Sequence, residues 1–256
     1  MEQSVQIIDR SAALDALKRQ LTLDPRRTAL VTVDLHRGHL DPDVATMPVP
    51  VEHARRVVQS AACLVRLARS LSIPVIHVIL QNRRLPGGAA EQLHNPFWRA
   101  VEAAGVSLTP AGASTVERHN LPGSRGTELM PELGPEPGDY VIDTKRRLSA
   151  FHGTDLEITL RSLEVETILL IGVNTNTCVQ CTAFDAFNRD FGVVVVADCV
   201  HSMYGDDLHL FGLQNIARAF GWVLSLDEVA EKLGTTMDGH QHRPEEDPAS
   251  AGRPPG

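Results

Sequence analysis

The sequence predicts an α/β fold of three layers, in which helices cover both faces of a six-stranded parallel sheet in the Rossmann-like manner. Short apolar runs rich in Val and Ile recur along the chain and are continuous rather than alternating, as in strands buried on both faces. Segments with apolar residues spaced three or four apart lie between most of these runs. This alternation favours a parallel sheet with right-handed crossovers.

The predicted strands are six short apolar runs that share this Val- and Ile-rich character. They cover residues 28–34, 73–80, 140–144, 167–173, 193–198 and 221–225. The helical patterns cover residues 51–71, 155–163, 178–190 and 206–220. Within the first of these, Val57, Ala61, Leu64, Val65 and Ala68 fall on one face of a helix.

The chain of 256 residues is predicted to hold one domain over residues 1–236. Residues 81–138 interrupt the strand–helix rhythm with many Pro and Gly turn signals. We expect this segment to contain a short helix near residues 96–104 and to act as a lid or as a contact between copies of the chain. Residues 237–256 are polar and rich in Pro and Gly, which predicts a disordered tail.

Composition excludes several classes of function. A net charge of −8 argues against a nucleic-acid binder, and 4% aromatic residues argue against base stacking. Four cysteines in a chain of this length do not form a disulfide framework, and the N-terminus lacks the apolar core of a signal peptide. No apolar run approaches the roughly 18–20 residues that span a bilayer. We therefore expect a cytoplasmic protein that binds a small molecule, assembles with copies of itself and contacts neither nucleic acid nor membrane.

Three chemically active side chains follow the predicted strands at their carboxyl ends, where doubly wound folds bind ligands. Asp34 ends the first strand, Lys145 follows the third, and Cys178 lies in the segment GVNTNTC after the fourth, where a helix should begin. A carboxylate, an amine and a thiol are thus predicted on the same edge of one sheet. Each of them alone has a structural explanation, but their joint position indicates catalysis.

The chemistry of a thiol explains why all three groups would be needed. Lowering a thiol pKa by two units costs about 2.7 kcal/mol, whereas a helix dipole supplies about 0.3–1 and at most ~2 kcal/mol. Lys145 is the cation expected to supply the rest. Asp34 can accept the thiol proton and pass it to the departing nitrogen. The backbone N–H groups of Thr177 and Cys178 are expected to face the developing oxyanion.

Three motifs together resemble the isochorismatase-like cysteine hydrolases. They are VTVDLH, the run from Lys145 to Leu156 that contains SAFHGTDL, and IGVNTNTCV, and the resemblance extends over residues 28–229. It implies a six-stranded parallel sheet, a catalytic triad of Asp34, Lys145 and Cys178, and no cofactor. It also implies a cis peptide bond between Val173 and Asn174 that turns backbone N–H groups toward the oxyanion.

The segment TNTCVQCTAFDAFNRDFGVVV is most similar to the branch of ureidoacrylate, biuret and carbamoyl-amide hydrolases. The resemblance therefore implies hydrolysis of a C–N bond beside a carbonyl, through a thioester, in a small ureido, carbamoyl or amide substrate. His36 and His39 stand where many relatives carry Gln and an aromatic residue, and we expect them to shape the pocket or contact substrate. Arg146, Phe151 and Asn174 are further candidates for substrate contact.

Other interpretations remain open. Asp34, Asp41, His36 and His39 could form a metal site, but their spacing does not by itself converge four ligands, and we expect none. The Asp-x-His metal motif of nicotinamidases is absent between residues 41 and 77. A redox role for the Cys178-Val-Gln-Cys181 pair and a non-catalytic scaffold are further alternatives. So is an isochorismatase proper, which needs no thiol and would resist alkylation.

Overall fold

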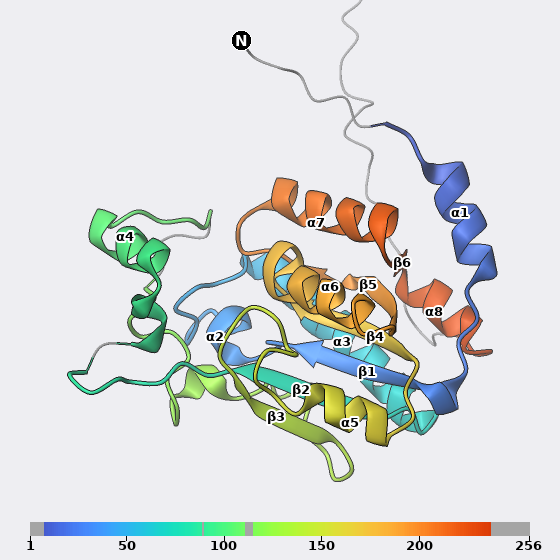
Figure 1. Cartoon of the computed structure of the whole chain (residues 1–256), viewed down its shortest axis with the longest axis horizontal. Coiled ribbons are helices and arrows are strands. Elements are labelled where there is room, and N and C mark those ends of the chain that lie inside the picture. The colour runs from blue at the N-terminus through green and yellow to red at the C-terminus, as the bar shows by residue number, and fades with distance from the viewer. Residues whose placement is uncertain (1–7, 89, 111–114, 237–256) are drawn as a thin grey trace, which may run out of the picture.

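The computed structural model describes residues 8–88, 90–110 and 115–236. Its centre is a six-stranded sheet with the strand order β3-β2-β1-β4-β5-β6, and every neighbouring pair is parallel (Figure 1). The sequence prediction of a six-stranded parallel sheet between helical layers is confirmed. The predicted tail at residues 237–256 lies outside the described residues.

The strands match the predicted runs closely. Their bounds are β1 Thr28–Val33, β2 Val75–Leu80, β3 Tyr140–Lys145, β4 Thr167–Val173, β5 Gly192–His201 and β6 Trp222–Leu224. The largest difference is in β5, which extends three residues beyond the predicted end at Asp198. This longer strand carries its carboxyl end to the same edge of the sheet as the end of β4, because Val173 pairs with His201.

The helices include all the predicted ones and three short ones that the apolar pattern did not indicate. Their bounds are α1 Ser11–Gln20, α2 Arg37–Leu40, α3 Val51–Ser70, α4 Pro96–Ala104, α5 Leu156–Ser162, α6 Gln180–Phe187, α7 Asp206–Ala219 and α8 Leu226–Lys232. The missed helices are α1, α2 and α8. Helix α1 buries none of its residues, although Ala13, Leu14 and Leu17 lie at helical spacing.

Two apolar cores lie on opposite faces of the sheet. On one face α3 and α8 pack against alternate strand residues such as Leu30 and Val194. On the other face α5, α6 and α7 pack against the intervening residues, among them Val31 and Val195. Because both faces are covered, the inner strands β1 and β2 are buried at every position and mostly apolar, which is the nearly continuous pattern seen in the sequence.

A close approach of backbones fixes the carboxyl ends of the two central strands. Gly172 near the end of β4 has φ +133°, and a Cβ there would lie 2.0 Å from the carbonyl oxygen of Val33 in β1. Only glycine fits this position. The ends of β1 and β4, which carry Asp34 and the segment before Cys178, are therefore held side by side.

The segment between β2 and β3 extends beyond the carboxyl ends of the strands. Its helix α4 lies at residues 96–104, where a short helix was predicted, and stands off from the sheet on the left in Figure 1. Asn95 caps α4 through its side chain, Pro96 occupies its first turn, and Gly105 ends it in a left-handed conformation. Among the described helices, none is long and apolar enough to cross a membrane.

Candidate active site

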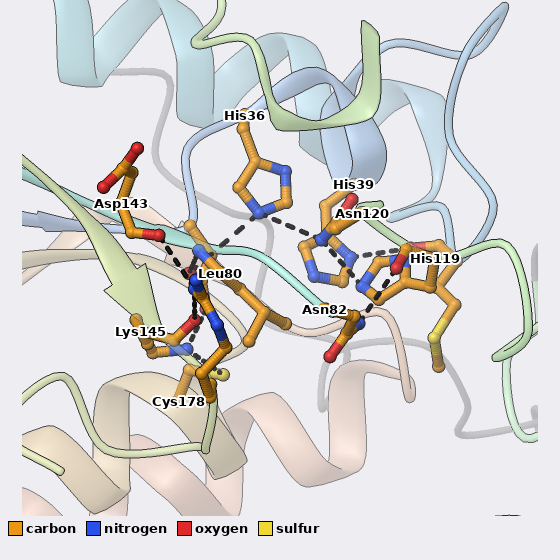
Figure 2. A network of polar contacts seen from close by, with 12 residues as sticks. His36, His39, Leu80, Asn82, His119, Asn120, Asp143, Lys145 and Cys178 are labelled. Atoms are coloured by element: carbon orange, nitrogen blue, oxygen red, sulfur yellow. Dashed lines mark hydrogen bonds and ion pairs between the residues drawn. The ribbon is translucent and has the colours of Figure 1, made fainter. Parts of the chain in front are cut away.

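Asp34, Lys145 and Cys178 meet at the carboxyl edge of the sheet. The Lys145 Nζ lies 2.7 Å from Asp34 Oδ2 and 3.4 Å from Cys178 Sγ. Asp34 and Lys145 have no exposed surface and Cys178 is 3% exposed. Figure 2 shows the Lys145 amine and the Cys178 sulfur next to each other. The structure therefore brings the three residues predicted as a triad into direct contact.

The end of β1 holds the Asp34 carboxylate in a fixed orientation. Asp34 has φ +58°, a left-handed conformation that is uncommon for a non-glycine residue. Its backbone N–H donates to the Val78 carbonyl, and its Oδ1 accepts the N–H of Leu80 at 2.9 Å. One carboxylate oxygen is thus held by the backbone of β2, while the other faces the Lys145 amine.

An irregularity at the sheet edge directs Lys145 inward. Strand β3 is the edge strand, two positions from β1, so the amine must reach across β2. Between Ile142 and Lys145, β3 carries one residue more than β2 does between Val78 and Leu80. A bulge of this kind re-aims the following side chain. Lys145 is accordingly buried while the two residues before it are exposed.

Cys178 lies in a π-helical turn, η4 at Thr175–Val179, and α6 begins only after it at Gln180. This corrects the prediction that an α-helix begins at the cysteine. The peptide bond between Val173 and Asn174 is cis, as the resemblance implies. The Thr177 N–H donates to the Asn174 carbonyl at 3.0 Å. The expectation that this N–H faces an oxyanion is therefore corrected, because it already has an acceptor.

The environment of the thiol differs from the expected one. Burial raises the pKa of Cys178 to about 12, because the opposing effect of the Lys145 ammonium is smaller and the Asp34 carboxylate adds to the rise. Burial acts to lower the pKa of Lys145, but the charge of Asp34 and the hydrogen bonds to Asp34 and Cys178 outweigh it and leave that pKa above its usual value. At neutral pH the resting site thus holds a charged amine and a protonated thiol, not the preformed thiolate predicted from the sequence.

A buried chain of polar side chains begins beside Asp34 at His36 and continues through Asn120 to His119. Figure 2 shows these last three residues on the side away from the Cys178 thiol. His36 Nε2 lies 4.0 Å from Asp34 Oδ1 and accepts a hydrogen bond from Asn120 Nδ2 at 3.2 Å. The same amide donates to His119 Nε2 at 2.9 Å. Burial, with the nearby charges of other histidines and Lys145, lowers the pKa of His36 and of His119 well below the usual value. This chain is therefore neutral at pH 7.

His36 and His39 do not contact the cavity at the site, which corrects their expected role in substrate contact. Both are buried, and their rings stack with centroids 5.1 Å apart. His39 Nδ1 donates to the Met47 carbonyl at 2.8 Å. Their ligand atoms do not converge with those of Asp34 or Asp41 into a metal site. Within the described ranges, only His53, His201 and Asp206 gather three ligand atoms within 4.8 Å.

A cavity of about 1300 Å³ opens between α4 and the body of the protein, next to the triad. Its wall includes Leu80, Arg146 and Thr177, each of which adjoins a triad residue through the chain or a hydrogen bond. Arg146 donates through Nη1 to two backbone carbonyls, those of Asp143 and Lys145. Within the described part of the chain no carboxylate forms an ion pair with Arg146, so its charge is available to an anionic ligand.

Two other residues proposed for substrate contact have structural roles. Phe151 lies in the apolar core, where its ring stacks on Phe191 with a centroid distance of 6.1 Å, and it does not line the cavity. Asn174 is 2% exposed, and its Oδ1 accepts the N–H of Met203 at 2.8 Å. Both expectations are corrected, since Phe151 stabilises the layer beneath the site and Asn174 joins the ends of β4 and β5.

Sequence reasoning also missed residues that complete the site. Asn82 donates to the His119 carbonyl, and His119 and Asn120 extend the polar chain to the segment between β2 and β3. This segment has no periodic pattern, so no residue spacing indicated that its side chains contact His36 beside the triad. The one available hint was its length, which is unusual for a loop without a function.

The parallel α/β sheet, with a carboxylate, an amine and a thiol in contact at its carboxyl edge, agrees with the comparison with family models. Residues 28–228 match the isochorismatase domain, so the chain belongs to the isochorismatase family. A curated relative, the ureidoacrylate amidohydrolase RutB of Methylobacterium radiotolerans, is 32% identical over 228 residues, covering 86% of this chain and 85% of the relative. A second, of the same name from Variovorax paradoxus, is 27% identical and covers 86% of both chains.

Solved structures support the same assignment. A cysteine hydrolase from Pseudomonas syringae pv. phaseolicola has a TM-score of 0.69 at 24% identity, covering 84% of this chain and 96% of that one, which shows the shared fold. N-carbamoylsarcosine amidase from Thermoplasma acidophilum has a TM-score of 0.57 at 25% identity, covering 78% and 97%. The predicted reaction class, hydrolysis of a C–N bond other than a peptide bond, is confirmed by these amidohydrolase relatives.

Proposed function

We propose that the protein is a cysteine-dependent amidohydrolase that cleaves the C–N bond of an anionic ureido or carbamoyl substrate. The observation that carries the proposal is the Lys145 amine, which contacts both the Asp34 carboxylate and the Cys178 sulfur. The names of the amidohydrolase relatives support the ureido and carbamoyl class. The guanidinium of Arg146, which lines the cavity and forms no ion pair with a carboxylate of the described residues, supports a negative charge on the substrate.

In the proposed mechanism Asp34 acts as the base in both halves of the reaction. It takes the proton of the Cys178 thiol as the sulfur attacks the carbonyl carbon, because a thiol with a pKa of about 12 is not ionised beforehand. The oxyanion forms close to the Lys145 ammonium and to the backbone N–H groups of Asn174 and Cys178. When the tetrahedral intermediate collapses, the C–N bond breaks and the nitrogen leaves with the proton from Asp34.

Water then hydrolyses the thioester. Asp34 removes a proton from the water that attacks the acyl carbon, and the C–S bond breaks. The departing sulfur recovers that proton, so the site returns to its resting state. Lys145 stays charged throughout and stabilises whichever of the two neighbouring groups is negative, the carboxylate or the sulfur.

The test is the release of ammonia from a panel of amides. The panel contains ureido acids, N-carbamoyl amino acids, biuret, nicotinamide and simple amides, each assayed with wild-type protein and with the Cys178→Ala variant. We expect release from ureido or carbamoyl acids by the wild type alone. Turnover restricted to nicotinamide or to simple amides, or equal turnover by Cys178→Ala, would contradict the proposal.

Location in the cytoplasm, assembly into a homo-oligomer and a lid role for residues 81–138 belong to the same proposal. Several apolar side chains of α6 and α7 are exposed in the described part of the chain, such as Phe187 at 49% and Leu210 at 41%, and this exposure supports self-association. Light scattering after size-exclusion chromatography gives the mass in solution. A monomer at micromolar concentration would contradict the oligomer.

A further inference from the structure

The cavity beside the triad is larger than a short ureido acid requires. Its volume is about 1300 Å³, whereas pockets that enclose drug-sized ligands measure about 300–1,000 Å³. A short acid bound at Arg146 would leave most of this space to water. The size of the cavity therefore points to a substrate with a further part that extends away from the triad.

The wall that would contact this further part is apolar. Helix α4, which stands beyond the carboxyl ends of the strands in Figure 1, contributes Phe97 and Trp98. The opposite wall contributes Phe184 from α6, Tyr204 from the turn after β5, and Leu208 from α7. In the free protein Phe97 is 60% exposed and Leu208 is 37% exposed. An apolar ligand would remove these side chains from water, and this is the dominant source of affinity in such pockets.

We propose that the preferred substrate is an anionic carbamoyl or ureido compound that carries a bulky apolar group, aromatic or long aliphatic, held between α4 and the start of α7. The proposal rests on the amidohydrolase function above and adds the chemical class of the substituent. Arg146 adjoins the triad through Lys145, so the anionic end and the scissile bond are placed together and the apolar group occupies the outer cavity.

The test compares substrates that differ only in the apolar group. We would measure ammonia release from N-carbamoylglycine, N-carbamoylleucine and N-carbamoylphenylalanine, using both enantiomers of the last two. We expect kcat/KM for the phenylalanine compound to exceed that for the glycine compound by at least about tenfold, because each buried methylene contributes to binding. Calorimetry on the Cys178→Ala variant measures the affinity for the same compounds without turnover.

Variants of the wall assign the preference to the cavity. Phe97→Ala and Leu208→Ala are expected to lower the ratio of the two kcat/KM values by about three- to tenfold each. Phe211→Ala is the matched control, since Phe211 lies on the same helix as Leu208, is 50% exposed and does not line the cavity. This control should leave the ratio unchanged.

The outcomes separate the two proposals. A ratio near one, a preference for the glycine compound, or a ratio unaffected by both wall variants would overturn the apolar-substituent inference while leaving the amidohydrolase function intact. Absence of ammonia release from every ureido and carbamoyl compound would refute the function. In that case, tighter binding of the phenylalanine compound to Cys178→Ala by at least about tenfold would still support the apolar subsite, and equal or absent binding would overturn it.

Discussion

Replacing Asp34 by Asn should make the thiol more reactive and the enzyme less active. The carboxylate has two opposite effects on Cys178. Its charge raises the thiol pKa, together with burial, to about 12, yet it is the proposed acceptor of the thiol proton during the reaction. Asn keeps the shape and retains one oxygen for the Leu80 N–H, but it removes the negative charge. The two effects can therefore be separated by one substitution.

The size of the change follows from the contacts in the site. A charge in close contact shifts a pKa by about 1–3 units, and thiol reactivity at fixed pH follows roughly half of that shift because nucleophilicity falls with pKa. Alkylation of Cys178 by iodoacetamide at pH 7.5 should thus be about 3- to 30-fold faster in Asp34→Asn. Ammonia release should fall by at least about 10²-fold, the usual contribution of a positioned base.

The assay combines peptide mass spectrometry of the alkylated Cys178 with steady-state ammonia release. Lys145→Gln serves as the contrasting variant. Because the Lys145 ammonium acts to lower the thiol pKa, this variant should slow alkylation and also reduce turnover. The refuting result is slower alkylation of Cys178 in Asp34→Asn than in the wild type, together with the loss of activity. That result would mean that the carboxylate promotes thiolate formation in the resting enzyme, which contradicts the assignment of Asp34 as the base.

Three further outcomes are expected. Cys178→Ala should abolish turnover, because Cys178 is the thiol that accepts a hydrogen bond from Lys145. Cys181→Ser should retain most of the turnover, because Cys181 lines the cavity wall and is not the proposed nucleophile. Similar losses in both variants would indicate a dithiol mechanism. Acid should unfold the protein readily, because the pKa values of buried His36 and His119 lie well below their unfolded values and stability is lost as pH falls below about 6.5. Denaturant titrations should show a lower unfolding free energy at pH 5 than at pH 7, and equal stability at both pH values would contradict this. Dialysis against a strong chelator should leave ammonia release unchanged, because the proposed nucleophile is a thiol. Loss of activity that zinc or manganese restores would instead indicate a metal-dependent mechanism.

The sheet and the position of the triad were predictable because they depend on simple patterns. Buried parallel strands are apolar at every position, and ligand sites lie at their carboxyl ends. Asp34 directly follows β1 and Cys178 lies in the turn after β4, so their proximity required only the correct strand order. Lys145 required more, because its path across β2 depends on a bulge that no residue pattern in β3 indicates.

The electrostatic state of the site was not predictable from residue types. The sequence places a cation near the thiol, which suggests a lowered pKa, but complete burial outweighs that cation and raises the pKa of Cys178. The assignment of Phe151 failed for a related reason. Phe151 lies six residues after Lys145 in the motif that ends at Leu156, yet its side chain enters the core instead of the cavity. Neither the depth of a group nor its direction can be read from spacing in an irregular segment.

The central claim is that Cys178 forms a covalent acyl-enzyme. The most direct measurement is mass spectrometry of the intact protein and its peptides after a reaction with an N-carbamoyl substrate is quenched with acid. The account predicts an acyl adduct on the peptide that contains Cys178 and none in Cys178→Ala, which should also release no ammonia. An adduct on Cys181, or ammonia release by Cys178→Ala at the wild-type rate, would contradict it.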